Sequence, residues 1–352
     1  MHGENNVKRG QIRGWLFEAV LRILLEKSGF DMVRPGPANE GRVRMLRRHF
    51  VEIKGRGDWH QIDLPFDYPG SVPFLYPVRL LGEAKYLKTE VSKDLIRNFI
   101  GAMKDIQENY FVDDSLTEQM VSGRRMELGA FFSARGFSEP AERLSYAHGI
   151  RTVSYRNNAV VDGLRLQIDA LEQDYLPYVM LKVGGVSEFL ADFRTAIGDD
   201  GDLGHFLVLW GIDPGAELLL EQMKAGLQAV GSSFFASTDT GVLLHFLGAE
   251  AFPSELFGQR DEARVRVSYE RVSNENQYYL VFSETEENSR FYFSPPRALD
   301  KAALYGTSKT PENGMPLRIS MKIKGVQRSL TIRMEQDWLD ADNELNMTAE
   351  SY

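Results

Sequence analysis

The sequence of 352 residues contains no cysteine, which excludes disulfide bonds and thiolate metal sites. No apolar run approaches the roughly 18 residues that a membrane-spanning helix needs. The N-terminal stretch MHGENNVKRGQIRGW lacks the apolar segment of a signal peptide. The G-x-x-x-x-G-K-[ST] run of nucleotide-driven motors is absent, as are G-x-S-x-G and H-E-x-x-H. We therefore expect a cytoplasmic protein with no membrane partner and no motor of its own.

Positive charge is scarce in the rear of the chain. Residues 1–160 hold 24 of the 41 Lys and Arg residues and 20 of the 50 Asp and Glu residues, so the front is mildly basic and the rear strongly acidic. Only the front is therefore a plausible surface for a polyanion such as DNA. The acidic rear favours a protein partner or a regulatory surface.

The spacing of apolar residues predicts an α/β domain over residues 1–160. Expected helices and strands alternate along it: helix 12–28, strands 49–54, 60–66 and 77–85, helix 91–107, strand 128–133, a helix from 138 to 149 and strand 150–155. Strand, helix and strand in that order predict parallel neighbours in one sheet.

The sequence of the rear predicts a linker, two folded regions and a tail. Residues 161–180 are expected to form a polar helical linker, 181–255 a small α/β region with a strand at 205–211, 256–340 an antiparallel β-rich domain and 341–352 a frayed acidic tail. Aromatic residues alternate along the β-rich domain. They favour either a core or a platform on which bases stack.

Three charged residues lie at the ends of segments that otherwise resemble buried strands. Residues two apart in a strand share a face, so Glu83 and Lys85 point the same way, and Asp63 ends the neighbouring predicted strand. Two such carboxylates, completed by waters and a substrate phosphate, suit octahedral Mg²⁺, which polarises a phosphate and lowers the pKa of bound water. An edge-strand salt bridge without a catalytic role is the alternative interpretation.

Four stretches of the front share their order with one nuclease family. They are GWLFEAVLRILLEKSGF, QIDL, LLGEAKYLK and ELGAFFSARGFSEPAERLSYAHGI, and the helix SKDLIRNFIGAMKD fits among them. Together they resemble the Mrr-type restriction endonucleases of the PD-(D/E)xK nuclease superfamily, over about residues 10–156 only. The expected fold is therefore α/β, a restriction-endonuclease-like mixed sheet flanked by helices, followed by an α+β, β-rich C-terminal region.

The resemblance implies a role for each charged residue. Asp63 and Glu83 would bind Mg²⁺, for which Mn²⁺ can substitute, and Lys85 would be the catalytic lysine. Glu18, in the apolar first helix, would be an accessory acid beside the metal. The alternative for Glu18 is a surface position on an incompletely buried helix.

The chain departs from the family just before the aspartate, where GDWHQID replaces the usual glycines. Asp58 thereby competes for the ligand role. His60 and Gln61 become candidate accessory groups near the site, and a structural role is the alternative for His60.

The densest basic stretch, residues 42–57, is the candidate DNA-binding surface, and a solvated loop or strand face is the alternative. The predicted phosphate contacts are Arg42, Arg44, Arg47, Arg48, Lys54 and Arg56.

The leading hypothesis is a metal-dependent endodeoxyribonuclease of bacterial restriction or antiphage defence. Its C-terminal region would select targets, bind a partner or regulate activity, and it would act as a homodimer because a double-strand cut needs two active sites. One alternative is a nucleic-acid-binding or assembly subunit that keeps the fold without turnover. Another is a nuclease acting on RNA or on branched junctions.

Overall fold

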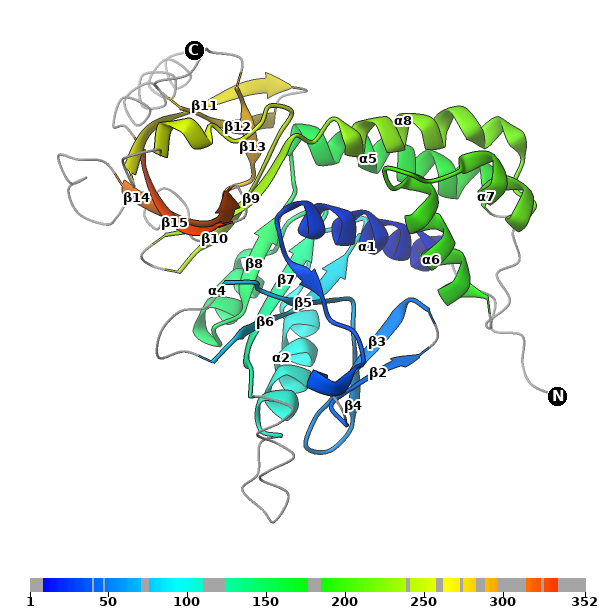
Figure 1. Cartoon of the computed structure of the whole chain (residues 1–352), viewed down its shortest axis with the longest axis horizontal. Coiled ribbons are helices and arrows are strands. Elements are labelled where there is room, and N and C mark those ends of the chain that lie inside the picture. Colours follow the sequence, from blue (N-terminus) through cyan, green and yellow to red (C-terminus); the bar gives the residue numbers. More distant parts are fainter. Residues whose placement is uncertain are drawn as a thin grey trace.

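The computed structural model shows a mixed α/β protein in which one helix, α1 (Arg9–Lys27), is packed between a five-stranded sheet and a layer of further helices (Figure 1). The structure describes residues 9–39, 41–46, 48–70, 76–109, 124–176, 185–238, 241–257, 262–272, 275–282, 289–296, 315–323 and 326–334. No helix within these ranges combines the length and the apolar character needed to cross a membrane.

The main sheet has the strand order β1-β5-β6-β7-β8. Its strands are β1 (Asp31–Met32), β5 (Leu64–Asp67), β6 (Val78–Lys85), β7 (Met126–Ser133) and β8 (Arg151–Ser154). The pairs β1–β5 and β5–β6 are antiparallel, whereas β6–β7 and β7–β8 are parallel. The parallel pairing of β7 with β8 confirms the prediction made from the strand, helix, strand order.

A second, antiparallel sheet has the order β2-β3-β4 and lies beside the main one. Its strands are β2 (Val43–Leu46), β3 (Phe50–Lys54) and β4 (Trp59–Ile62), and a short 3₁₀ helix, η1 (Pro37–Asn39), precedes β2. The single strand expected at 60–66 is therefore two strands in different sheets. Asp63 is the only residue between them, so the chain changes sheet at a predicted catalytic residue.

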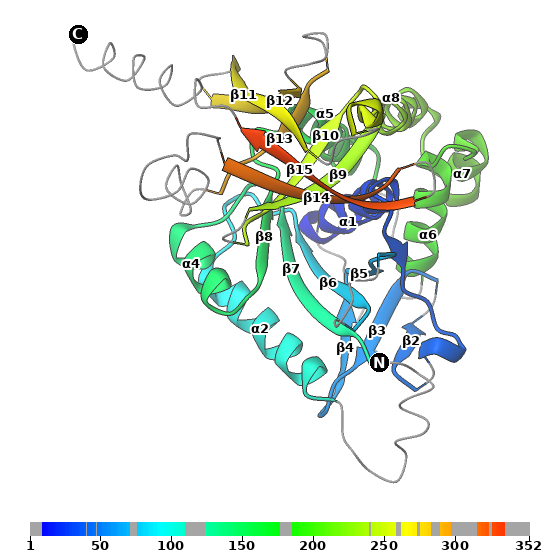
Figure 2. The ribbon, with the colours of Figure 1, turned by 60° about the vertical axis from the view of Figure 1, so that its left-hand side comes forward.

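Helices cover both faces of the main sheet. Helices α2 (Lys93–Gln107) and α4 (Glu139–Ala147) lie on one face and α1 on the other (Figure 2). Side chains alternate between these faces along β6. Leu81 belongs to the core beneath α2, whereas Leu80 and Ala84 belong to the core beneath α1.

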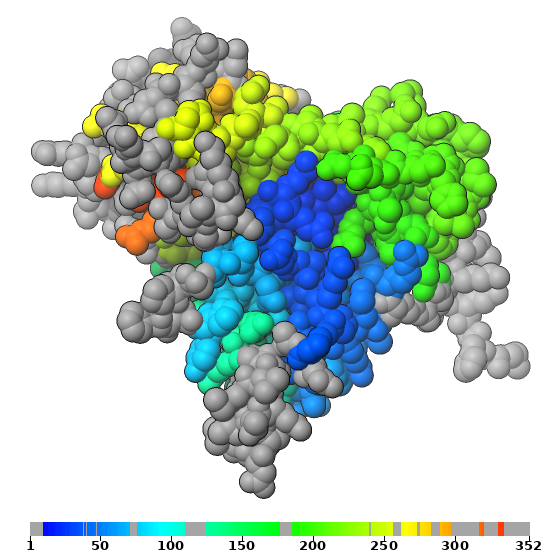
Figure 3. Space-filling view, viewed as in Figure 1, coloured from blue at the N-terminus to red at the C-terminus, as the bar shows by residue number. Residues whose placement is uncertain are grey.

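The second side of α1 is covered by a helical layer from the middle of the chain. Its elements are α5 (Ala159–Ala170), the π-helical turn η2 (Leu171–Tyr175), α6 (Val186–Ile197), α7 (Leu203–Trp210), the 3₁₀ turn η3 (Pro214–Ala216) and α8 (Glu217–Gln228). In the space-filling view the dark blue residues of α1 lie between this layer and a separate β-rich lobe (Figure 3).

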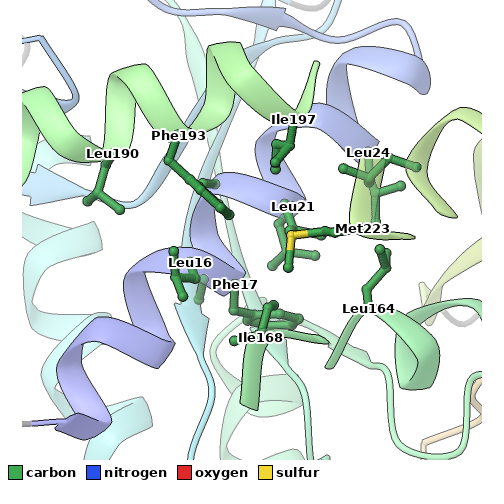
Figure 4. Close-up of a cluster of buried hydrophobic side chains, with 14 of the residues drawn as sticks. Leu16, Phe17, Leu21, Leu24, Leu164, Ile168, Leu190, Phe193, Ile197 and Met223 are labelled. Carbon is green, nitrogen blue, oxygen red and sulfur yellow. The ribbon is translucent and has the colours of Figure 1, made fainter. Parts of the chain in front are cut away.

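Residues 161–176 are therefore core and not a linker. Leu164 and Ile168 pack with Leu21 of α1, Phe193 of α6 and Met223 of α8 in one buried cluster (Figure 4). Burying a side chain of this size contributes roughly 1.5–3 kcal/mol. The helix was predicted, but its apolar face was not assigned to the core of the front domain.

The strand predicted at 205–211 is wrong, because these residues form α7. The Asp202 side chain caps the helix by accepting a hydrogen bond from the His205 N–H at 2.9 Å, and Gly211 ends it at φ 59°. Phe206 and Leu207 are buried while Val208 is 83% exposed, a pattern of helical period. The described residues of 185–231 are accordingly helical, and the strands of the predicted α/β region begin only at Ser232.

Seven strands form a closed barrel in the order β10-β13-β12-β11-β15-β14-β9. They are β9 (Ser232–Thr238), β10 (Leu243–Gly248), β11 (Glu262–Val272), β12 (Glu275–Phe282), β13 (Phe291–Phe293), β14 (Met315–Ile323) and β15 (Val326–Met334), with the 3₁₀ turn η4 (Ser254–Phe257) between β10 and β11. The barrel begins at Ser232, well before the predicted boundary at 256. Its pairs are antiparallel, as expected, except that β11 and β15 are parallel.

The aromatic residues of the barrel divide between core and surface. Phe282, Phe291 and Phe293 are buried in the barrel core, which favours the core interpretation for them. Tyr279 and Tyr292 are half-buried, and the centres of their rings are 5.7 Å apart. The predicted acidic tail lies outside the described residues.

A buried polar network joins the barrel to the front domain. The hydroxyl of Tyr155, the residue after β8, is 2.7 Å from Nδ1 of His245 in β10, and Nε2 of His245 is 2.8 Å from Oγ of Ser233 in β9. Burial lowers the pKa of His245 to about 3, so the ring is neutral at neutral pH and each nitrogen has a hydroxyl partner.

Candidate active site

Asp63, Glu83 and Lys85 converge at the carboxyl end of β6. Leu64 pairs with Gly82 in the β5–β6 ladder, and continuing that register by one residue sets Asp63 opposite Glu83. The Lys85 ammonium forms an ion pair with Oε1 of Glu83 and lies 3.7 Å from Oδ2 of Asp63. The three residues predicted from the sequence are therefore neighbours on one side of the strand.

Local packing fixes the position of the Asp63 carboxylate. The backbone N–H of Ala84 donates to its Oδ2 at 3.0 Å. A Cβ at Gly82 would lie only 2.7 Å from Cβ of Leu64 and 3.0 Å from the Phe132 ring, so a residue without a side chain lets the strands approach this closely. The glycine before Glu83 thus brings the two carboxylates together.

Glu18 also reaches this site, and it is buried. Its side chain is 4% exposed, which contradicts a surface position. Oε1 accepts hydrogen bonds from Nη2 of Arg22 at 2.6 Å and lies 2.9 Å from Nε2 of His49. Nη2 of Arg22 bonds both Glu18 and the carbonyl oxygen of Asp63, and the charges of Lys85 and Glu83 affect the pKa of Glu18, so the accessory acid belongs to the same site.

Arg22 and His49 also belong to the site, although neither was predicted from the sequence. The Arg22 guanidinium donates from Nε and Nη2 to the carbonyl oxygen of Asp63 at 3.0 and 2.7 Å, and from Nη1 to the carbonyl oxygen of His49 at 2.8 Å. The N–H of His49 donates to Oγ of Ser187 in α6 at 2.7 Å. Arg22 follows Glu18 by four residues and so shares its helix face, a signal that could have been used. His49 carries no comparable local signal.

Burial dominates the electrostatics of the carboxylates. Burial, reinforced by Glu18, raises the pKa of Asp63 to about 6; burial, reinforced by Asp63, raises the pKa of Glu83 to about 7. Burial also raises the pKa of Glu18 to about 7, against the opposing effect of Arg22. The three carboxylates repel one another, and the positive charges of Arg22 and Lys85 do not bring their pKa values back to the ordinary range.

The two bases respond differently to the same surroundings. Burial acts to lower the pKa of Lys85, but the Asp63 and Glu83 carboxylates outweigh it and raise that pKa above its usual range. Lys85 is therefore an ammonium at neutral pH. Burial lowers the pKa of His49 to about 2, so its ring is neutral beside Glu18.

The carboxylate pair is compatible with a hydrated Mg²⁺ ion. In the described part of the chain, no group of three or more His, Cys, Asp or Glu side chains is arranged to hold a metal. Mg²⁺, however, usually keeps several waters and binds proteins through one or two carboxylates. Burial and the repulsion from Asp63 together raise the pKa of Glu83, and a divalent cation would relieve the repulsion.

The other accessory residues predicted from the sequence lie elsewhere. Nε2 of His60 is 2.7 Å from Oδ2 of Asp105 in α2, and Gln61 is exposed on β4. Asp58 is exposed and accepts a hydrogen bond from the N–H of Trp59. The structure does not bring these three side chains into contact with Asp63, Glu83 or Lys85, and the His60 contact favours the structural interpretation.

The basic stretch is interleaved with acids. Arg44 pairs with Glu52 at 2.5 Å and its guanidinium lies 4.3 Å from the centre of the Trp59 ring. Arg42, Arg48 and Arg56 also have carboxylate partners, at 3.8, 2.8 and 3.8 Å respectively. Lys54 is exposed, and Arg47 lies outside the described residues. The positive charge that this stretch offers a polyanion is therefore partly compensated.

A cavity of about 380 Å³ lies between the front domain and the barrel. Glu90, Arg156 and Glu275 line it, and Arg156 pairs with both acids. None of the candidate catalytic residues lines this cavity.

Comparison with known proteins adds little to this geometry. No protein-family model matches the sequence, and no curated protein matches it. A crystal structure titled "Protein of Unknown Function AF1548" matches at 12% identity with a TM-score of 0.32, over 60% of this chain and 95% of that chain. At this TM-score the likeness carries no argument about fold or function.

Proposed function

We propose that the protein is a metal-dependent endonuclease with a restriction-endonuclease-like front domain. The observation that carries the proposal is the convergence of Asp63, Glu83 and Lys85 at the end of one strand, with Glu18 close by. A salt bridge alone would need only one of the carboxylates. Three carboxylates that compete for one ammonium and one buried guanidinium are costly to keep unless they serve a ligand.

Each side chain has a distinct role in the proposed reaction. Asp63 and Glu83 would hold Mg²⁺, or Mn²⁺ in its place, and the ion when bound would polarise the scissile phosphate and activate a water molecule. Lys85, already protonated, would orient that water or stabilise the negative charge developing on the phosphate, and it would not act as a general base. Glu18 would bind outer waters of the same ion.

The remaining proposals concern substrate and setting. The resemblance to Mrr-type nucleases supports DNA as the substrate and restriction or antiphage defence as the role. A double-strand cut needs two active sites, which supports a homodimer, and the absence of cysteine supports a cytoplasmic location. The acidic rear of the chain supports a protein partner there.

The test is a cleavage assay on purified protein with Mg²⁺ or Mn²⁺, using plasmid, modified, phage and branched DNA together with RNA. We expect metal-dependent cleavage by the wild type, and a loss of about 10²–10³-fold or more in Lys85→Ala because a group that stabilises the transition state is removed. Lys88→Ala is the matched control, because Lys88 is exposed three residues further on.

Cleavage that survives both Lys85→Ala and Glu83→Ala would exclude the site. Salt-sensitive DNA binding without cleavage would instead indicate the assembly or binding subunit. Cleavage confined to RNA or to junctions would change the substrate and leave the chemistry in place.

A further inference from the structure

We infer that Arg22 is a positioning residue that fixes the Glu18 carboxylate and the main chain of Asp63 relative to each other. This inference rests on the proposed function, since it concerns how the same site holds its metal. Arg22 would not touch the substrate or the ion.

The contacts of Arg22 join three separate segments. Its fully buried guanidinium bonds to Glu18 in α1, to the carbonyl of His49 before β3, and twice to the carbonyl of Asp63 between β4 and β5. Asp63 is where the chain leaves one sheet for the other. A planar guanidinium presents its donors in a fixed fork, so it can fix three acceptors at once, whereas an ammonium cannot hold them in that geometry.

The hydrogen bonds at the site engage only one oxygen of each of the three carboxylates. Arg22 and His49 both contact Oε1 of Glu18, Ala84 and Lys85 approach Oδ2 of Asp63, and Lys85 pairs with Oε1 of Glu83. Among the described residues, the second oxygen of each of these three carboxylates accepts no hydrogen bond. Holding one oxygen of each acid and leaving the other free prepares a set of ligands for an ion and its waters.

A purely structural role for Arg22 predicts a different result, and Arg79 supplies the comparison. Arg79 is also buried, lies on β6, and donates to both oxygens of Asp67 at 2.7 and 2.9 Å and to Asn39 at 2.8 Å. It makes three hydrogen bonds, all to side chains, where Arg22 makes four, and none of the three involves Asp63 or Glu18. Arg79→Lys therefore controls for the loss of a buried guanidinium.

The experiment measures Mn²⁺ affinity by electron paramagnetic resonance or calorimetry in full-length wild type, Arg22→Lys and Arg79→Lys. We expect Arg22→Lys to bind Mn²⁺ about 10–100-fold more weakly, as is usual when a group orienting a metal ligand is lost, and Arg79→Lys to bind like the wild type. Raising the Mn²⁺ concentration should restore cleavage in Arg22→Lys but not in Lys85→Ala.

Equal Mn²⁺ affinity in Arg22→Lys and wild type would overturn the inference while leaving the nuclease proposal intact. A wild type that neither binds Mn²⁺ nor cleaves any substrate would overturn both. If Arg22→Lys does not fold, Arg22→Gln, which keeps two donors without a buried charge, is measured in its place with the same two outcomes.

Discussion

Replacing Glu83 by glutamine should stabilise the metal-free protein at high pH. Burial and the nearby Asp63 raise the pKa of Glu83 to about 7 from an ordinary value of 4.5. An acid whose pKa is higher in the folded state binds its proton more tightly there, so the free energy of unfolding falls as pH rises between these two values. Glutamine keeps the shape of the protonated acid and avoids this loss.

The magnitude follows from the size of the shift. Two and a half pKa units correspond to about 3 kcal/mol when the group is fully ionised in the folded state. The Glu83 side chain is 23% exposed, so solvent screening reduces the expected gain to about 1–2 kcal/mol. For a chain of this size that gain raises Tm by roughly 1–3 °C.

The assay is thermal unfolding of wild type and Glu83→Gln at about pH 5 and about pH 8, without divalent metal and then with Mg²⁺. The difference in Tm should be small at the lower pH and largest at the higher, and Mg²⁺ should reduce it because only the wild type binds the ion well. Glu108→Gln is the control, because that glutamate is 62% exposed at the end of α2. A Tm difference that is independent of pH, or opposite in sign, would refute the reasoning.

Two further predictions test strand packing at the site and the hydrogen-bond network between the front domain and the barrel. Gly82→Ala should cost about 1–3 kcal/mol of folding free energy and reduce cleavage, because its Cβ would force β5 away from β6. Gly101→Ala in α2 is the control and should not destabilise the protein, because nothing lies within 4 Å of the added Cβ. Chemical denaturation measures the stability of both variants. Tyr155→Phe should lower the free energy of unfolding by about 1–3 kcal/mol, because it leaves Nδ1 of buried His245 without a partner. Tyr146→Phe, at a 51% exposed position, is the control and should have little effect. A Tyr155→Phe variant as stable as wild type would contradict the assigned network.

The sequence was informative where the two-residue alternation of side chains along a strand determines which residues share a face. The alternation along β6 was enough to predict that Glu83 and Lys85 share a face, and the position of Asp63 at a strand end was enough to select it as their partner. A run of apolar residues such as 205–211 satisfies both helix and strand patterns, so the helical choice depended on the capping residue Asp202 and on packing against other helices.

Contacts between distant segments were the part that the sequence could not supply. His49 meets Glu18 across 31 residues and Ser187 across 138, and neither separation leaves a periodic signal. The break between β4 and β5 at Asp63 was also missed, because residues 59–67 continue the strand-like composition through it. The core role of α5 depends on α1, which lies more than a hundred residues earlier in the chain.

The position of α1 decides where the chain could be divided. A fragment ending at residue 160 would keep the candidate catalytic residues but lose Leu164, Ile168, Phe193 and Met223, and so would expose the outer side of α1 to water. Such a fragment should aggregate instead of folding. A unit that keeps the helical layer over α1 extends to Val230, but that cut would still remove Phe235 and Leu247, which belong to the same core.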